Sequence, residues 1–169
     1  MGRLTWPARA GRPPQRSLLA LAGITGATLG AAGVGAAATA PNLRPWYERL
    51  DKPAWTPPDA AFGPVWSLLY AAQAVAAWLA WRAGPAPGPA LGLYGAQLAL
   101  NLGWSLLFFG LRRPGWALVE IAVLWIAIAA TVTAFARRSW VAAWLMVPYL
   151  AWVTFALALN AAIWRRNRS

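Results

Sequence analysis

The chain has 169 residues, of which 60% are hydrophobic and only 11% are charged, and 13 of them are tryptophan. A soluble domain of this length has too small an interior to bury so much apolar surface, so the composition excludes an ordinary soluble enzyme and indicates a membrane protein. The formal net charge is +11. The arginines lie in short clusters at the ends of apolar runs, which is typical of lipid-headgroup anchors and argues against a nucleic-acid-binding surface.

The residue types that are missing narrow the chemistry further. The sequence has no histidine and no cysteine, which excludes disulfides, thiolate nucleophiles and histidine proton relays, and removes the usual zinc ligands. No Walker loop or GxGxxG motif is present. We therefore expect no metal site and no required cofactor.

Five apolar runs follow one another along the chain, and each is long enough to cross a bilayer as a helix, which takes about 20 residues. They cover residues 18–40, 62–81, 91–111, 116–135 and 140–164. The three connections after the second run are short and carry arginine, proline or glycine, which predicts antiparallel neighbours. The sequence thus predicts an all-α membrane protein, a bundle of five transmembrane helices over 18–164, with a basic N-terminal tail (1–17) and a basic C-terminal tail (165–169).

The first run has two interpretations. Arg12 and Arg16 precede it and it ends in Ala38-Thr39-Ala40, a pattern that also fits a cleavable signal peptide. We favour a membrane-spanning helix because the run is long for a signal sequence. Gly26 and Gly30 form a GxxxG pattern, from which we expect close packing within the bundle rather than dimerisation, although a homodimer stays possible.

Residues 41–61 join the first two runs and are predicted to form a structured loop that lies as a lid at the membrane surface. The segment 46–66 reads WYERLDKPAWTPPDAAFGPVW, with prolines at 53, 57, 58 and 64. Proline removes backbone donors and restricts the residue before it, so this segment cannot be one long helix. Its amphipathic rings, among them Tyr47 and Trp55, suit the water-lipid boundary or the flat face of a ligand.

Three helices carry aromatic and amide side chains at helical spacing, which places them on single stripes. The stripes are Trp66, Tyr70 and Gln73 on the second helix, Gln97, Asn101, Trp104 and Phe108 on the third, and Tyr149, Trp152, Ala156 and Asn160 on the fifth. Amides are costly against lipid, so the stripes should face inward. They predict a pocket for a flat, largely apolar ligand with polar edges. The alternative is that the amides only tie helices together.

Glu120 is an acid inside the fourth run. It is either a functional group within the bundle, as intramembrane acids often are, or the partner of Arg112 or Arg113 in a local ion pair.

Four ordered motifs resemble the TspO/MBR family, also called the translocator protein or peripheral benzodiazepine receptor family. They are Trp46-Tyr47, Lys52-Pro53 and Trp55-Thr56-Pro57-Pro58 with Gly63-Pro64-Val65-Trp66; Gln97-Leu98-Ala99-Leu100-Asn101 with Trp104 and Phe108; Gly115-Trp116 with Glu120; and Pro148-Tyr149-Leu150-Ala151-Trp152 with Ala156 and Asn160. The composition, rich in alanine, arginine and proline, suggests a bacterial member, which we expect to be a multi-pass integral protein of the cell envelope.

The resemblance implies a five-helix membrane protein that binds porphyrins such as protoporphyrin IX beneath the first loop. From the stripes, the lid and this resemblance together, we expect ligand contacts at Tyr47, Trp55, Pro57, Trp66, Tyr70, Gln97, Asn101, Trp104, Phe108, Tyr149, Trp152, Ala156 and Asn160. Without histidine or cysteine, axial ligation of haem iron is poorly supported, so metal-free porphyrin is favoured. Arg44, Arg49 or Lys52 in the lid are candidates to meet its propionates.

Three functions stay open at this point. The first is a sensor or scavenger that binds tetrapyrroles. The second is a light- and oxygen-dependent porphyrin-degrading enzyme. The resemblance ties Trp66 and Trp152 to such breakdown, which makes them the candidate catalytic residues. The third is a transporter of tetrapyrroles or other apolar ligands, although five helices show no inverted repeat.

Overall fold

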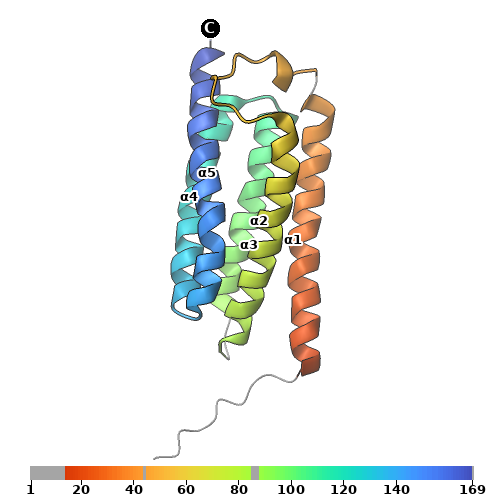
Figure 1. Cartoon of the computed structure of the whole chain (residues 1–169), viewed down its shortest axis with the longest axis vertical. Coiled ribbons are helices and arrows are strands. Elements are labelled where there is room, and N and C mark those ends of the chain that lie inside the picture. The colour runs from red at the N-terminus through yellow and green to blue at the C-terminus, as the bar shows by residue number, and fades with distance from the viewer. Residues whose placement is uncertain (1–13, 44, 85–87, 169) are drawn as a thin grey trace, which may run out of the picture.

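The computed structural model describes residues 14–43, 45–84 and 88–168. In chain order the elements are α1 (Pro14–Leu43), the short 3₁₀ turn η1 (Tyr47–Arg49), α2 (Asp59–Arg82), α3 (Gly88–Ser105), the π-helical turn η2 (Leu106–Gly110), α4 (Pro114–Ala136) and α5 (Trp140–Arg166) (Figure 1). All five α-helices are long and apolar enough to cross a membrane. The predicted fold class, an all-α bundle of five membrane-spanning helices, is confirmed.

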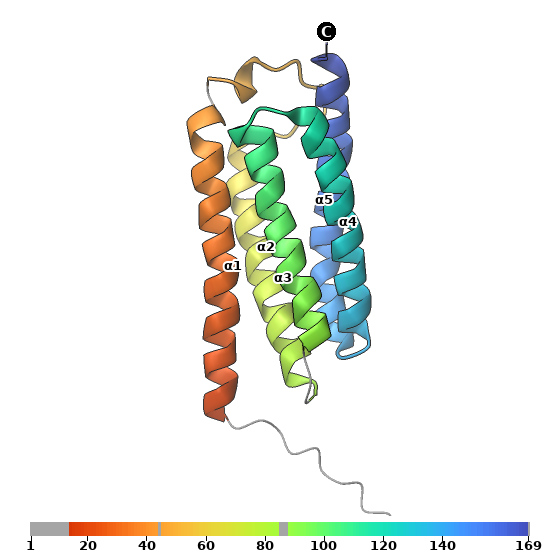
Figure 2. The same ribbon diagram turned by 180° about the vertical axis from the view of Figure 1, so that it is seen from behind.

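The helices stand side by side and run alternately up and down (Figures 1 and 2). Each packs mainly against two others, which gives the cyclic order α1, α2, α5, α4, α3. The densest packing joins α4 to α5, where Ile121, Leu124, Met146 and Tyr149 are almost completely buried. By contrast, α1 is the least buried of the five helices, because only 11% of its most apolar stretch of 18 residues is buried inside the bundle.

Local sequence explains where several helices begin. Ser139 caps α5, because its hydroxyl accepts a hydrogen bond from the backbone N–H of Ala142 at 3.3 Å. Pro114 opens α4, a position where the missing N–H costs nothing. Pro148 lies inside α5, which continues through it without a break.

The connection from α3 to α4 is unusually tight. The π-helical turn η2 ends α3, and Arg112 then adopts a φ of 54°, in the left-handed region that residues other than glycine rarely adopt. Its guanidinium donates to Oδ1 of Asn42 at 2.6 Å. This contact ties the turn to the end of α1 and helps to hold the strained backbone.

The helices extend further than the apolar runs. Residues 14–17, predicted as tail, begin α1; residues 59–61, predicted as loop, begin α2; and residues 165 and 166, also predicted as tail, complete α5. Hydropathy marks where the membrane core ends, whereas a helix continues as long as its backbone hydrogen bonds are satisfied. The connection between α1 and α2 is correspondingly shorter than predicted, and we call its described residues, 45–58, the lid.

The GxxxG pattern of α1 was predicted to pack within the bundle, and this prediction is wrong. Gly26 and Gly30 are exposed, and a Cβ added at either would meet nothing within 4 Å. Because successive residues advance by about 100° around a helix, these glycines lie opposite the face that does pack. On that face Thr28 shares a hydrogen bond of 2.7 Å with the hydroxyl of Tyr94, and Gly35 approaches Ser105.

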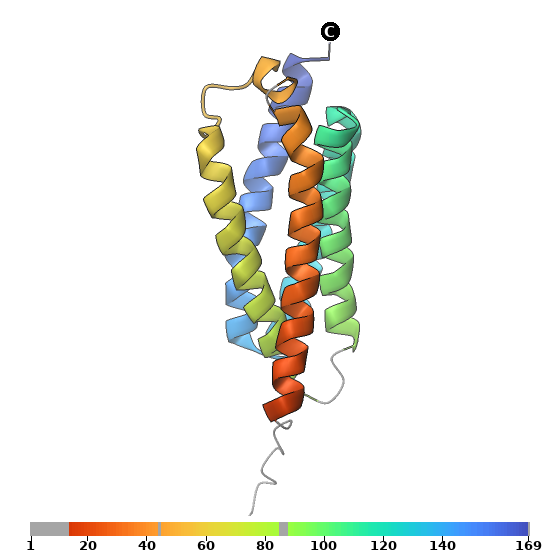
Figure 3. The same ribbon diagram turned by 90° about the vertical axis from the view of Figure 1, so that its right-hand side faces the viewer.

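The lid crosses one end of the bundle, which we call the lid end. It leaves α1, passes beside the C-terminal end of α5 and returns to α2 (Figures 1 and 3). Figure 3 also shows α1 and α2 diverging toward the lid end. This divergence sets the position of the candidate site.

Candidate ligand-binding cavity

A cavity of about 460 Å³ lies beneath the lid. Its wall comes from α1, α2, α3 with η2, and α5, while α4 contributes nothing. The lining residues are Ala32, Gly35, Ala36, Thr39, Ala40, Leu43, Tyr47, Asp59, Phe62, Gly63, Trp66, Ser67, Tyr70, Asn101, Trp104, Ser105, Phe108, Phe109, Trp152, Phe155, Ala156, Leu159, Asn160 and Ile163. A volume of this size falls within the range of about 300–1,000 Å³ that is usual for small-molecule sites.

Aromatic rings dominate the wall and form two stacked pairs. Trp66 and Tyr70 on α2 have ring centroids 5.4 Å apart with planes inclined by 29°, and Trp104 and Phe108 have centroids 5.4 Å apart with planes inclined by 26°. Aromatic walls of this kind favour a flat, largely apolar ligand.

The π-helical turn η2 brings two consecutive rings to the cavity, because both Phe108 and Phe109 line it. Turns of this kind are frequent at functional sites. The lid residues Trp46 and Tyr47 pack edge-on or tilted against these rings, with centroid separations of 5.4 Å for Trp46 and Phe108 and 5.6 Å for Tyr47 and Phe109. The lid and the end of α3 therefore form one aromatic cluster above the cavity.

Hydrogen bonds between helices join polar groups in and behind the cavity wall at two depths. The hydroxyl of Tyr70 donates to Oδ1 of Asn101 at 2.7 Å, and Nδ2 of Asn101 donates to the hydroxyl of Tyr149 at 3.1 Å. Nε1 of Trp104 donates to Oδ1 of Asn160 at 3.1 Å, and Nδ2 of Asn160 donates to the carbonyl of Pro114 at 2.8 Å. The deeper pair of bonds, at Asn101, and the pair nearer the lid, at Asn160, are both made by neutral groups, and together they hold α2, α3, α4 and α5 in register.

The cavity opens between α1 and α2. Its exposed lining residues, Ala36, Ala40, Asp59, Gly63 and Ser67, all belong to these two helices. Four of the five have small side chains, so no large side chain closes this opening. The lining residues of α3, η2 and α5 are all buried or half-buried.

Tyr47 closes the cavity from the lid side. Only 4% of it is exposed, and this burial, followed by the nearby Asp59 carboxylate, raises the pKa of its phenol from 10.0 to about 12. The phenol therefore stays protonated at neutral pH. The ammonium of Lys52 lies 4.9 Å from the Tyr47 ring centroid and donates to the carbonyls of Tyr47 and Glu48 at 2.9 and 3.0 Å.

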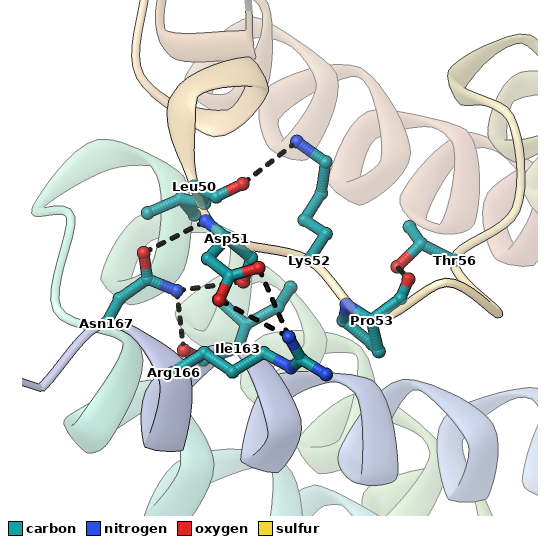
Figure 4. A network of polar contacts seen from close by, with 8 residues as sticks. All are labelled: Leu50, Asp51, Lys52, Pro53, Thr56, Ile163, Arg166 and Asn167. Carbon is teal, nitrogen blue, oxygen red and sulfur yellow. Dashed lines mark hydrogen bonds and ion pairs between the residues drawn. The ribbon is translucent and has the colours of Figure 1, made fainter.

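The end of α5 holds the lid in place (Figure 4). The backbone N–H of Asp51 donates to Oδ1 of Asn167, and Nδ2 of Asn167 donates to the carbonyl of Asp51, each at 3.0 Å. The guanidinium of Arg166 forms a salt bridge of 3.2 Å with the Asp51 carboxylate. Arg166 and Asn167, which were predicted as part of the basic C-terminal tail, therefore hold the lid against α5.

Most of the residues predicted as ligand contacts come together at this cavity. Those that line it are Tyr47, Trp66, Tyr70, Asn101, Trp104, Phe108, Trp152, Ala156 and Asn160. Four others lie off the cavity wall. Gln97 lies one turn deeper and bonds Gln73; Tyr149 lies behind Asn101; Trp55 is 51% exposed against Phe155; and Pro57 is half-buried in the lid.

Two of the three predicted propionate contacts lie off the cavity wall. Arg49 is exposed and Lys52 is bound to backbone carbonyls, and neither lines the cavity. Arg44 falls outside the described residues. In the part of the chain that the structure describes, no three acidic side chains gather as they would around a metal ion.

Of the two interpretations of Glu120, the ion pair with Arg112 or Arg113 is wrong. Both carboxylate oxygens of Glu120 are buried without a hydrogen-bond partner among the described residues, and one lies 3.4 Å from where a Cβ on Gly103 would be. Arg112 instead binds Asn42. Glu120 faces α3 and does not line the cavity.

The wall supplied by α1 was not predicted. Ala32, Gly35, Ala36, Thr39, Ala40 and Leu43 recur at intervals of three and four residues, which is the one signal that marks them as a common face. Asp59, Phe62, Gly63 and Ser67 of α2 were missed as well. Asp59, Phe62 and Gly63 extend the Trp66–Tyr70 stripe toward the lid at the same helical spacing, and Ser67 lies within it.

These features define a class of protein: a multi-pass integral membrane protein whose helices enclose an aromatic cavity under a structured loop. The sequence matches the TspO/MBR family over residues 22–165, and the chain belongs to this family. The matched region includes all of α2, α3 and α4 and most of α1 and α5.

Relatives from distant organisms are similar over most of the chain. The translocator protein of Homo sapiens is 46% identical over 127 residues, which are 72% of this chain and 75% of that protein. The tryptophan-rich protein TspO of Chlorobaculum tepidum is 40% identical over 156 residues, 90% of this chain and 98% of that protein. The tryptophan-rich sensory protein of Cereibacter sphaeroides is 42% identical over 134 residues, 78% and 84% of the two chains.

Proposed function

We propose that this protein binds a metal-free porphyrin, such as protoporphyrin IX, in the cavity beneath the lid and thereby senses or scavenges tetrapyrroles. The observation that carries the proposal is the pair of aromatic stacks, Trp66 on Tyr70 and Trp104 on Phe108, on two walls of a cavity of about 460 Å³. A porphyrin offers a broad flat apolar face to such walls.

The chemistry of the wall supports a porphyrin without iron. No histidine or cysteine exists in the chain, and the hydroxyl of Tyr70, which lines the cavity, already donates to Asn101. Strong axial ligands for haem iron are therefore scarce at this site. The cavity wall offers aromatic rings and apolar side chains, and the contacts that they make with a porphyrin need no metal.

The test is a titration of the purified protein in detergent with protoporphyrin IX in the dark, followed by tryptophan quenching and by the shift of the Soret band. The informative variant is Ala156→Phe, because Ala156 lines the cavity and a phenyl ring there would fill it. Ala158→Phe is the matched control, since Ala158 lies on the exposed face of α5. We expect saturable binding by the wild type and by Ala158→Phe, and a loss of at least tenfold in affinity in Ala156→Phe. Equal binding by all three would overturn the proposal.

A second candidate function is light-dependent porphyrin breakdown. It is favoured by one observation, that Trp66 and Trp152 line the same cavity. Light would excite the bound porphyrin, molecular oxygen would serve as the oxidant, and the two indoles would exchange electrons with the excited ring. Replacing both with Phe should then abolish the loss of porphyrin under illumination while dark binding falls only modestly. Parallel loss of binding and breakdown would make the two rings simple contacts.

A further inference from the structure

The cavity has an unusual distribution of charge. Among the described residues that line it, Asp59 is the only charged one. It is the first residue of α2 and is exposed at the opening between α1 and α2. Every other described lining residue is neutral, so the described wall of the cavity carries one negative charge, at the opening, and no positive one.

The nearby cations keep their charge but lie off the cavity wall. The ammonium of Lys52 is bound by backbone carbonyls, the guanidinium of Arg166 pairs with Asp51, and that of Arg112 binds Asn42. None of the three lines the cavity. The amide groups at the start of α2 carry a partial positive charge, which offsets the carboxylate only in part.

The influence of Asp59 reaches the ring that closes the cavity. Its carboxylate is the second cause, after burial, that raises the pKa of Tyr47. A ligand edge placed between Asp59 and Tyr47 would also experience the negative charge of the Asp59 carboxylate. The phenol of Tyr47, being protonated, offers a donor but no positive charge to such an edge.

We propose that Asp59 is a specificity-determining residue that makes the cavity prefer flat ligands whose edge at the opening is neutral or positively charged over ligands that carry carboxylates there. This inference rests on the proposed function, the binding of tetrapyrroles in the same cavity. It adds that tetrapyrroles with esterified or otherwise neutral side chains bind more tightly than the free dicarboxylic acid.

The physical basis is the repulsion of like charges near an apolar surface. Two unit charges several ångströms apart at a protein surface interact strongly enough to change an equilibrium by about three- to thirtyfold, and added salt weakens this effect. A neutral ester does not experience it. The difference between acid and ester therefore isolates the contribution of Asp59 from stacking.

The test compares protoporphyrin IX with its dimethyl ester on the wild type, Asp59→Asn and Glu48→Gln. Glu48 is an exposed acid of the lid that does not line the cavity, so it controls for net charge. We expect Asp59→Asn to tighten binding of the diacid by about fivefold and to change the Kd of the ester by less than twofold. Glu48→Gln should leave both nearly unchanged, and raising the salt concentration should narrow the gap between diacid and ester in the wild type.

A third ligand reverses the sign. A porphyrin whose propionates are converted to amides bearing ammonium groups should bind Asp59→Asn more weakly than the wild type. If the ratio of diacid to ester affinity is the same in Asp59→Asn and the wild type, the inference is wrong although tetrapyrrole binding stands. If the wild type binds neither porphyrin saturably, the proposed function fails and this inference fails with it.

Discussion

Asn167 pairs with the backbone of Asp51 through both ends of its amide: Oδ1 accepts from the Asp51 N–H and Nδ2 donates to the Asp51 carbonyl, each at 3.0 Å (Figure 4). These are the contacts that a neighbouring β-strand would offer, supplied by one side chain. Nδ2 also donates to the carbonyl of Ile163, which fixes the amide to the last turn of α5. The lid is thereby attached to α5 over 115 residues of sequence separation or more.

We expect Asn167→Ala to loosen the lid. Two hydrogen bonds to Asp51 are lost, each contributing about 0.5–1.5 kcal/mol, so amide exchange in the lid should accelerate about tenfold. Hydrogen-exchange mass spectrometry of peptides from residues 46–58 would measure this, and dissociation of a bound porphyrin should accelerate in parallel.

Asp51→Asn is the matched comparison, because it removes the salt bridge to Arg166 and keeps the backbone pairing with Asn167. The two side chains of the salt bridge are 47% and 60% exposed, and such pairs contribute about 0–1 kcal/mol. Exchange in the lid should therefore change by no more than about fivefold and less than in Asn167→Ala. A larger effect from Asp51→Asn would show that the salt bridge, and not the amide, holds the lid.

The Tyr70–Asn101–Tyr149 chain predicts a specific loss of stability. Asn101→Leu keeps a similar volume but removes the partner of both phenols, and Tyr149 is completely buried. Hydrogen bonds between membrane helices contribute about 0.6 kcal/mol on average, and an unsatisfied buried group costs about 1–3 kcal/mol. We expect a total loss of about 1–3 kcal/mol in denaturant unfolding in detergent micelles.

A double variant identifies the cause of that loss. Adding Tyr149→Phe to Asn101→Leu removes the phenol that has lost its partner. The double variant should therefore lose less stability than the sum of the losses of the two single variants. Strict additivity would mean that Asn101 acts through packing and not through its hydrogen bond to Tyr149.

The helices and the general position of the site were predictable from the sequence, because both follow from periodic patterns. Apolar runs locate spans to within a few residues, and the inward stripes put Asn101, Trp104 and Ala156 at one interior. The periodic pattern gives the face of a helix on which a residue lies, but it does not give the depth of that residue below the lid. Gln97 and Asn101 share a face, yet Gln97 lies one turn farther from the lid, where it bonds Gln73 below the cavity.

Other features depend on tertiary packing that leaves little local signal. The wall from α1 consists mainly of alanine and glycine, which carry no recognisable chemistry and are common throughout that helix. The exposed side of α1 holds Gly26 and Gly30, although their spacing is as typical of packing faces as that of the residues that do pack. The attachment of Asn167 to Asp51 joins residues 116 positions apart, which no periodicity reveals.

Gly115 at the start of α4 should not tolerate a larger residue. A Cβ at this position would lie 2.9 Å from Nε1 and 3.3 Å from Cδ1 of Trp164, so the indole would have to move. Trp164 also lies beneath the guanidinium of Arg168, at 5.1 Å from its centroid. We expect Gly115→Ala to destabilise the protein by about 1–3 kcal/mol, the usual cost of overpacking.

Gly92→Ala is the control for this prediction. Gly92 lies within α3, is exposed, and has nothing within 4 Å of an added Cβ. Alanine is the better helix former by about 1 kcal/mol, so this variant should be as stable as the wild type or more so. Thermal unfolding in detergent of the wild type, Gly115→Ala and Gly92→Ala measures both effects. If both alanine variants behave alike, contact with Trp164 is not the determining factor.

Alkaline pH should destabilise the lid through Tyr47. Its pKa is raised to about 12 in the folded protein, whereas an exposed tyrosine ionises near 10. Between these values the folded state holds the proton more tightly than the unfolded state, so this contribution to stability is complete below about pH 10 and is lost as the pH rises toward 12.

Tyrosinate absorbance measures this ionisation directly. The difference between the wild type and Tyr47→Phe should titrate near pH 12, and Asp59→Asn should lower the midpoint while leaving it above 10, because burial is the larger cause of the raised pKa and the Asp59 charge the smaller. The fall in stability between pH 10 and 12 should be smaller in Tyr47→Phe than in the wild type. A midpoint near 10 for Tyr47 would mean that water reaches the phenol and that the lid does not seal this side of the cavity.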